Sequence, residues 1–410
     1  MSPSSDPSSA TAVGRARPAD RRAQLINHAA GLFLAKGYAQ VSMADIARAA
    51  GITAPALYRH FADKQDILSA AVLAGMDDLE ACTDAALAPR SDGSAPTRQQ
   101  IIDTIAGLAV HRPDSAALWR WNSDYLSEEQ NREVGFRARG ILTRWTDALL
   151  TEQPQVPPPA RKQLAWAILS VTGSLAMHRT RIPAARARAT VTSTVSRLLT
   201  LDPSGIAPLA DSPIAHPTPN GRRDEIMDAA SELFRRRGFA DVGVDEIGAA
   251  VGISGPSVYK HFSNKAEILL SISRRNASRL DATVIAAYSQ TDQPLQRLQT
   301  LVDSYVQVLT ATPDLTVSFN NRPALHDVPG ADDLIAVQRA YVSRWIDLYG
   351  ELHPELTQPE RAVVVHAALT IINDAMRVQR NWRIEDGVLR GIQISGTLAY
   401  LAKGALGIAS

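Results

Sequence analysis

Apolar side chains recur along most of the chain at spacings of three and four residues, the pattern of amphipathic helices. Two sets of four apolar residues would each share one helix face: Ile26, Ala29, Ala30 and Phe33, and Ile226, Ala229, Ala230 and Phe234. Longer periodic stretches cover residues 161–181, 184–201, 359–380 and 387–406. Few segments alternate apolar and polar residues with the Val, Ile and Thr content of strands. The pattern therefore predicts an all-α protein.

Part of this pattern occurs twice. Shifting the sequence by 201 positions aligns 15 identical residues in a window of 36, where residue usage alone would give roughly two. In the first copy these are Phe33, Gly37, Ala39, Val41, Ile46, Ala49, Gly51, Ile52, Pro55, Tyr58, His60, Phe61, Lys64, Ile67 and Leu68. A fainter match continues downstream, for example from Arg144-Trp145 to Arg344-Trp345. So long a period indicates two similar domains rather than a solenoid, whose repeats run about 20–50 residues.

Residues with strong positional preferences mark where the helices of each copy begin and end. In the first copy these residues are Gly37, Ser42, Gly51, Thr53, Pro55 and Asp63, and their counterparts include Ser254, Pro256 and Asn264. Ser42, Thr53 and Ser254 are predicted to cap the short helices with their side chains. A short helix, a glycine turn and a second short helix predict a helix-turn-helix, which presents its second helix to the major groove of DNA.

Both windows resemble the DNA-binding domain of the tetracycline-repressor (TetR) family. The matching strings are Val-Ser-Met-Ala-Asp-Ile-Ala (41–47), Ala-Gly-Ile-Thr-Ala-Pro-Ala-Leu-Tyr-Arg-His-Phe (50–61) and Val-Gly-Ile-Ser-Gly-Pro-Ser-Val-Tyr-Lys-His-Phe (251–262). We therefore expect two TetR-like repeats in a pseudo-twofold arrangement. The expected order is a disordered tail (1–18), a helix-turn-helix domain (19–67), a helical regulatory domain (68–202), a Pro-rich linker (203–219), a second helix-turn-helix domain (220–268) and a second regulatory domain (269–410).

The resemblance implies which residues meet DNA in each head, a head being one helix-turn-helix domain. Base edges would face Ala54, Pro55, Ala56 and Arg59 in head one, and Gly255, Pro256, Ser257 and Lys260 in head two. Phosphates would be contacted by Ser42, Tyr58, His60, Lys64, Tyr259, His261 and Lys265, and the surface would include Ala44, Thr53 and Ser254. Two alternatives stay open: Tyr58 and His60 as packing residues, and Arg59 on a phosphate or in solvent. Leu57, Phe61, Val258 and Phe262 are predicted core.

The two heads differ in charge and in two surface residues. Residues 15–68 hold eight basic and four acidic residues, net +4, whereas 222–269 hold seven and eight, net −1. Gly243 replaces Ser42, and Asp245 replaces Ala44, where an acid accepts from a cytosine amino group or repels phosphate. Because phosphate neutralisation drives affinity, head one is predicted to bind DNA more strongly. Arg15, Arg17, Arg21 and Arg22 would precede the first helix either as a minor-groove arm or as a solvated tail.

The rest of each copy is less informative. The resemblance implies a homodimer-like arrangement, here between the two copies of one chain, and a small-molecule effector that is hydrophobic or acyl-CoA-like. Small residues at helical spacing in 165–176 suit close packing between the copies. The ligand candidates are Trp119, Tyr125, Trp166, His178, His366 and Asn373, although aromatic residues in apolar helices are more often core. A homodimer of chains remains the other possible assembly.

Composition narrows the function further. The 410 residues carry a net charge of +1 and one cysteine, Cys82, which excludes an intrachain disulfide and a Cys-based zinc site. No secretion signal, membrane span, catalytic motif, metal or cofactor is expected, so we expect a cytoplasmic protein that is not an enzyme. The sequence predicts a ligand-responsive repressor acting on an operator with two unequal half-sites. The rival interpretation is a DNA-binding adaptor whose degenerate second head binds protein or nothing.

Overall fold

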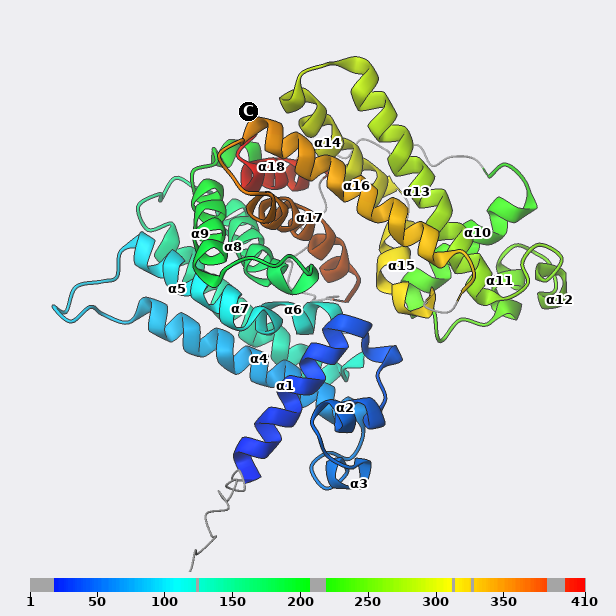
Figure 1. Cartoon of the computed structure of the whole chain (residues 1–410), viewed down its shortest axis with the longest axis horizontal. Coiled ribbons are helices and arrows are strands. Elements are labelled where there is room, and N and C mark those ends of the chain that lie inside the picture. The colour runs from blue at the N-terminus through cyan, green and yellow to red at the C-terminus, as the bar shows by residue number, and fades with distance from the viewer. Residues whose placement is uncertain are drawn as a thin grey trace, which may run out of the picture.

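The computed structural model describes residues 18–122, 125–206, 219–311, 314–325, 328–381 and 395–409. Within these ranges every regular element is a helix, in agreement with the predicted all-α class (Figure 1). The first repeat contains α1 (Pro18–Lys36), α2 (Met43–Ala49), α3 (Ala54–Leu57), α4 (Lys64–Leu87), α5 (Arg98–His111), α6 (Pro113–Asn122), α7 (Glu128–Leu149), α8 (Pro158–Ser174) and α9 (Ala184–Leu199). No described helix is long and apolar enough to cross a membrane.

The second repeat has the same order of helices. It contains α10 (Arg222–Arg237), α11 (Val244–Ala250), α12 (Gly255–Val258), α13 (Lys265–Gln290), α14 (Pro294–Ala311), α15 (Asp314–Asn320), α16 (Ala331–Leu352), α17 (Gln358–Asn381) and α18 (Ser395–Leu406). Short 3₁₀ helices lie at Tyr38–Gln40 (η1), Leu175–Met177 (η3), Pro203–Ile206 (η4) and Arg322–Leu325 (η5). The duplicated sequence therefore gives a duplicated fold.

Each head is a small helical unit built on its own apolar core. In head one Phe33, Ile46, Leu57 and Phe61 are at most 1% exposed, which confirms the predicted core positions. Their counterparts in head two, Phe234, Ile247, Val258 and Phe262, are at most 2% exposed. Removing this much apolar surface from water fixes the short helices, which are too short to be stable alone.

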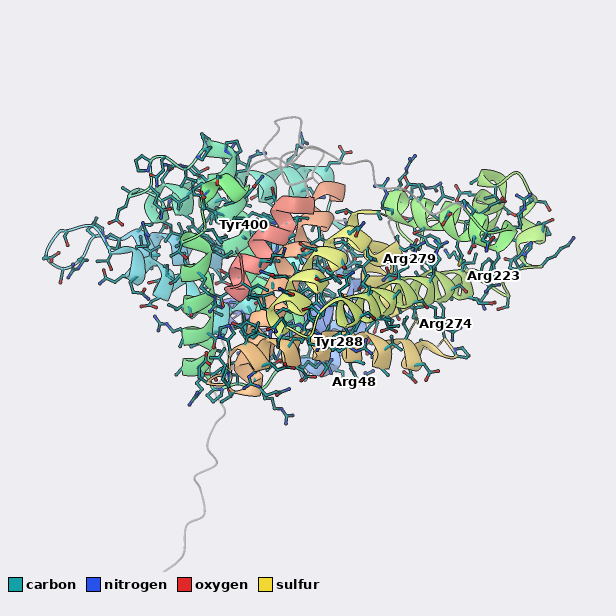
Figure 2. The ribbon with its side chains drawn as sticks, turned by 90° about the horizontal axis from the view of Figure 1, so that it is seen from above. Arg48, Arg223, Arg274, Arg279, Tyr288 and Tyr400 are labelled. Carbon is teal, nitrogen blue, oxygen red and sulfur yellow. The ribbon has the colours of Figure 1, made fainter. Side chains whose placement is uncertain are left out.

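The two repeats pack through α8 and α9 of the first and α17 and α18 of the second. α8 carries small buried residues, including Ala167, Ser170 and Gly173. Gly173 faces α6 of its own repeat, where a side chain would overlap the Arg120 guanidinium, so close packing of these residues between the copies stays a prediction. Polar contacts border the interface: Arg197 donates to the Ala405 carbonyl at 2.8 and 3.0 Å, and Tyr400 Oη donates to the Asp202 carbonyl at 3.2 Å. Figure 2 shows Tyr400 where α18 meets the first repeat. The four helices thus join the repeats within one chain.

The heads lie at the periphery, away from this four-helix interface (Figure 1). Head one also touches the second repeat, because η1 lies against η5. Ion pairs fix head two to its own repeat: Arg275 of α13 binds Asp228 of α10 at 2.8 Å and the buried Asp314 of α15 at 2.9 Å. Arg279 adds a second contact to Asp314 at 2.8 Å. These ion pairs therefore link the position of α10 in head two directly to the positions of α13 and α15.

Three sequence predictions about element ends are corrected. The helix expected over 161–181 ends at Ser174 and tightens into η3, because apolar periodicity does not distinguish the two helix types. The linker expected from 203 starts as η4, whose Ile206 is 1% exposed, and residues 207–218 lie outside the described part. The first helix already begins at Pro18, so Arg21 and Arg22 belong to α1 rather than to an arm. The stretch expected over 387–406 is helical from Ser395 to Leu406, and residues 387–394 lie outside the described part.

Candidate functional site

The turn between α2 and α3 shapes the exposed surface of head one. Gly51 has φ 65°, a left-handed conformation that favours glycine, and the chain reverses there before Thr53 starts α3. Pro55 and Arg59 are exposed, and Ala54 and Ala56 are half-buried. Gly252 has φ 70° and produces the same turn in head two. The two heads thus present their second short helix in the same way.

Two aromatic side chains project from these surfaces. Tyr58 and Tyr259 directly follow α3 and α12, and each is 55% exposed. Such exposure contradicts the packing alternative for Tyr58 and leaves its hydroxyl free to reach a neighbouring molecule. His60 and His261 are half-buried. Among the described residues no ion pair involves the exposed Arg59 or Lys260, so both cations remain open to solvent.

Several polar side chains of the heads already have internal partners. Ser42 Oγ donates to Asp45 Oδ2 at 2.6 Å and accepts from the Asp45 backbone N–H at 3.1 Å, forming a capping box. This contact lowers the pKa of the Asp45 carboxyl. Lys64 Nζ donates to the Tyr38 carbonyl at 2.9 Å and lies over the Tyr38 ring, and partial burial lowers its pKa. Contact with DNA would require Ser42 and Lys64 to exchange or share these partners.

At the start of α11, head two keeps one of the two hydrogen bonds of the capping box and lacks the other. Gly243 has no hydroxyl, but its backbone N–H still donates to Glu246 Oε2 at 2.8 Å. Lys265 Nζ donates to the carbonyls of Phe239 and Val242 at 2.7 and 2.9 Å, as Lys64 does in head one. The predicted side-chain caps at Thr53 and Ser254 are wrong, since neither makes a capping hydrogen bond, and Ser254 Oγ instead lies 2.9 Å from Ser257 Oγ.

Asp245 and Gly255 form a matched pair in head two. A methyl group at residue 255 would overlap the Asp245 carboxylate, so the carboxylate occupies the place that a larger residue would need. Head one has the opposite arrangement, with Ala44 and Ala54 at these positions. The pair brings a negative charge to the first turn of α12, on an exposed part of the head.

Ion pairs within head two also neutralise its arginines. Each arginine of α10 pairs with a glutamate: Arg222–Glu225, Arg223–Glu267, Arg235–Glu232, Arg236–Glu232 and Arg237–Glu246. In the described part of head one the ion pair is Arg48–Asp45 at 3.0 Å, within α2. Among the described residues, the difference in net charge between the heads is therefore accompanied by a difference in how many cations have no ion-pair partner.

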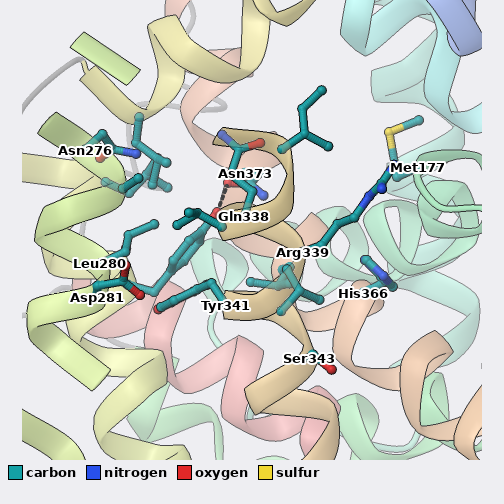
Figure 3. Close-up of a pocket in the computed structure, with 18 of the residues that line it drawn as sticks. Met177, Asn276, Leu280, Asp281, Gln338, Arg339, Tyr341, Ser343, His366 and Asn373 are labelled. Carbon is teal, nitrogen blue, oxygen red and sulfur yellow. Dashed lines mark hydrogen bonds between the residues drawn. The ribbon is translucent and has the colours of Figure 1, made fainter. Parts of the chain in front are cut away.

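A cavity of about 350 Å³ lies in the second repeat, between α13, α14, α16 and α17 (Figure 3). Its walls are mainly apolar and include Leu280, Leu309, Leu315, Val342 and Leu369, and Met177 of the first repeat closes one side. Tyr305 Oη donates to Asn373 Oδ1 at 2.9 Å in the wall. Asn276 Oδ1 is buried without a hydrogen-bond partner among the described residues. The cavity therefore combines apolar walls with polar atoms able to orient a small molecule.

A second cavity of about 410 Å³ adjoins the first and lies between the repeats. It is lined by His178, Arg179, Thr180, Arg181, Ile346, Gln358, Pro359, Ala362 and His366, of which Ile346 and His366 also line the first cavity. The rings of His178 and His366 stack with centroids 4.4 Å apart. Burial lowers the pKa of His178 to about 3 and that of His366 to about 4, so both rings are neutral at pH 7.

Comparison with known proteins identifies the repeated heads. The family described as "Bacterial regulatory proteins, tetR family" matches residues 25–71 and 226–272. The chain belongs to the TetR family and carries its DNA-binding domain twice. Over 84 residues it is 38% identical to the transcriptional activator FasR of Mycolicibacterium smegmatis, covering 20% of this chain and 38% of that protein. Over 134 residues it is 24% identical to the transcriptional repressor KstR of Mycobacterium tuberculosis, covering 33% and 61%. The chain therefore spans less than two thirds of these relatives.

Two solved structures of regulators align with part of this chain. The ketosteroid transcriptional regulator KstR2 of Mycobacterium tuberculosis covers 48% of this chain and 99% of its own, with 24% identity and a TM-score of 0.38. AibR, solved with isovaleryl coenzyme A and operator DNA, covers 46% and 97%, with 18% identity and a TM-score of 0.37. Each of these two structures therefore aligns with about half of this chain.

The ligand candidates of this TetR-family chain fall into two groups. His366 and Asn373 line the apolar cavity and His178 lines the adjoining one. Trp119 and Trp166 are at most 2% exposed and pack edge to face in the core of the first repeat, as the alternative reading of aromatic residues held. Tyr125 is 40% exposed and stacks on Tyr38, with ring centroids 4.3 Å apart. None of these three aromatic residues lines either cavity.

Sequence analysis missed most residues that line this cavity, including three with polar side chains. Asn276, Gln338 and Arg339 line the cavity from α13 and α16, and Figure 3 shows Arg339 extending toward Met177. A signal was present for Asn276, because an amide among apolar residues on a helix face is unusual in a core. Gln338 and Arg339 lie on a helix with many other polar residues, so the sequence gave no reason to select them.

Proposed function

We propose that the chain is a ligand-responsive transcriptional repressor that binds DNA sequence-specifically as a single-chain pseudo-dimer. The observation that carries the proposal is the pair of exposed recognition surfaces held by one four-helix interface within the chain. A TetR-type head presents its second helix to the major groove, and two joined heads read two half-sites. Intrachain packing of α8 and α9 on α17 and α18 supplies the joint that two separate subunits would otherwise form.

The two half-sites of the operator are expected to be unequal. Arg59 of head one corresponds to Lys260 of head two, Ala56 corresponds to Ser257, and Asp245 stands in head two where head one has an alanine. Head one, with net charge +4, supplies more phosphate neutralisation than head two, whose α10 arginines are paired with glutamates. The preferred operator is therefore an asymmetric one, with the larger share of the binding free energy at the half-site of head one.

The apolar cavity is the proposed effector site. Its volume of about 350 Å³ and its apolar walls suit a small hydrophobic molecule. It lies between α13, which continues from head two, and α17, which packs on the first repeat. A ligand that binds one arrangement of these helices better than another shifts the spacing of the heads, and release of DNA follows by linkage.

Recovery of genomic fragments bound by the full chain, followed by footprinting and light scattering of the complex, tests the proposal. We expect one chain per site and two protected half-sites. Y58A/R59A should weaken binding more than the matched Y259A/K260A, because head one supplies more of the electrostatic contact. Two chains per site would contradict the pseudo-dimer. A reporter gene placed behind the recovered operator shows whether expression falls, as proposed, or rises.

The adaptor alternative has one observation in its favour, the charge of head two. If head two does not bind DNA, the footprint covers one half-site and Y259A/K260A leaves the affinity unchanged. The same two measurements therefore separate a pseudo-dimeric regulator from an adaptor with a degenerate second head.

A further inference from the structure

The two adjoining cavities differ in chemical character. The cavity inside the second repeat has mainly apolar walls, with its acidic residue Asp281 paired to Arg344 at 2.9 Å. No acidic residue is among those that line the cavity between the repeats, where Arg179 and Arg181 are exposed. Ile346 and His366 belong to both walls, so the cavities are neighbours. An apolar space thus leads to a cationic one.

The cationic side is built by the first repeat. After η3 the chain turns away at His178, which is extended (φ −140°, ψ 163°), and residues 178–181 line the cavity. His178 Nδ1 accepts from the Thr180 backbone N–H at 3.3 Å, which assigns the ring proton to Nε2. That Nε2 atom is buried without a hydrogen-bond partner among the described residues. Within the described part of the chain it is a donor without an acceptor, on a residue that lines the same cavity as Arg179 and Arg181.

The second repeat has no equivalent of this turn. By the register that pairs Ala176-Met177 with Ala375-Met376, the counterpart of residues 178–181 is 377–380, and there α17 continues as a helix to Asn381. The segment with Arg179 and Arg181 is therefore present in the first repeat alone, and the cavity that it lines adjoins the apolar cavity of the second repeat. Arg339 of α16, which lines the apolar cavity, extends toward Met177 of the first repeat (Figure 3).

We propose that the effector is an amphiphile with an apolar chain and an anionic head, bound once per chain across the two repeats. The chain occupies the apolar cavity, and the head lies against Arg179, Arg181 and the His178 Nε2–H. Charge-assisted hydrogen bonds from guanidinium groups favour a carboxylate or phosphate at this position. The inference rests on the proposed effector role of the apolar cavity and adds the class of ligand.

Three probes of equal chain length test the proposal on the full-length chain by isothermal titration calorimetry: dodecanoate, dodecanoyl-CoA and dodecanol. We expect the two anions to bind with one site per chain and dodecanol to bind at least about tenfold more weakly. R179Q/R181Q should weaken both anions about tenfold or more and leave dodecanol unchanged. A larger loss for dodecanoyl-CoA than for dodecanoate would place phosphates at the arginines, because the acyl group of dodecanoyl-CoA is a neutral thioester. A larger loss for dodecanoate would place a carboxylate there.

Two controls keep the result interpretable. R132Q, which alters an exposed arginine of α7, should change none of the affinities, and A277F, which fills the apolar cavity, should weaken all three. Absence of binding by both anions, or anion binding that R179Q/R181Q does not weaken, overturns the proposal. The affinity of the chain for DNA is measured separately, with and without the anions. If the anions bind through the two arginines but the affinity for DNA does not change, the proposed ligand class is upheld and the proposed effector role is contradicted.

Discussion

Arg120 of α6 and Asp374 of α17 form an ion pair in the middle of the protein, where both side chains are fully buried. Arg120 Nη1 lies 3.0 Å from Asp374 Oδ2, and it approaches Ser170 Oγ at 3.5 Å. Burial lowers the pKa of Arg120, while the neighbouring carboxylate acts in the opposite direction. Gly173 of α8 makes room for the guanidinium, because a side chain at that position would overlap it. The pair therefore joins a helix of each repeat.

Replacing one partner should be far more costly than replacing both. D374L leaves an uncompensated guanidinium in the interior, and breaking a buried pair in this way costs about 3–5 kcal/mol. R120L/D374L removes both charges and fills the space with apolar groups, which is often close to neutral. The difference between the single and double variants measures the coupling of the two residues.

Urea denaturation of D374L, R120L and R120L/D374L, followed by circular dichroism and tryptophan fluorescence, provides the measurement. We expect each single variant to lose several kcal/mol of unfolding free energy and the double variant to recover most of that loss. A single variant that loses less than about 1 kcal/mol would refute the reasoning, since the charge left behind would then be solvated or neutralised. A double variant as unstable as the single ones would show that the side chains contribute through shape alone.

Two further predictions concern the heads and the histidine pair. D245A should strengthen DNA binding through head two, because it removes a negative charge beside α12. Gel-shift titration measures this effect, and an unchanged DNA affinity of D245A would contradict the charge argument. G255A should destabilise head two unless it is combined with D245A, and thermal unfolding measures that effect. Because burial depresses the pKa values of His178 and His366 to about 3 and about 4, the unfolded chain binds more protons between about pH 4 and pH 6.5, so stability should fall as the pH is lowered through that window. H178F/H366F should flatten this dependence, and a wild-type unfolding midpoint that does not change between pH 7 and pH 5 would exclude a role for the pair.

The heads could be predicted from sequence because local rules determine them. Ser42 with Asp45, the turn at Gly51 and the core residue Phe61 each act over a few neighbouring residues, and each lies where the pattern placed it. Thr53 is in the expected place but makes no capping hydrogen bond, which depends on a side-chain rotamer that sequence does not specify.

The cavities could not be predicted because they arise from contacts between distant segments. Met177 and His366 are nearly two hundred residues apart, and only the packing of α8 on α17 brings them to one wall. Trp119 and Trp166 are aromatic residues of the kind that often line ligand sites, but they are buried in the interior of the first repeat. Apolar periodicity reports that a face is buried and does not report whether the space beside it is filled.

Fusion of the repeats explains why their differences can persist. In a homodimer every substitution appears on both sides of the twofold axis, so a carboxylate facing a guanidinium across the interface would occur twice. Here the register that pairs Ala176-Met177 with Ala375-Met376 makes Leu175 the counterpart of Asp374 in the first repeat. The ion pair with Arg120 is therefore made on one side of the interface. Asp245 with Gly255 likewise changes one head and leaves the other intact. A single chain can therefore carry the proposed stronger DNA contact in one repeat and the proposed effector cavity in the other, and the packing of α8 on α17 joins the two repeats.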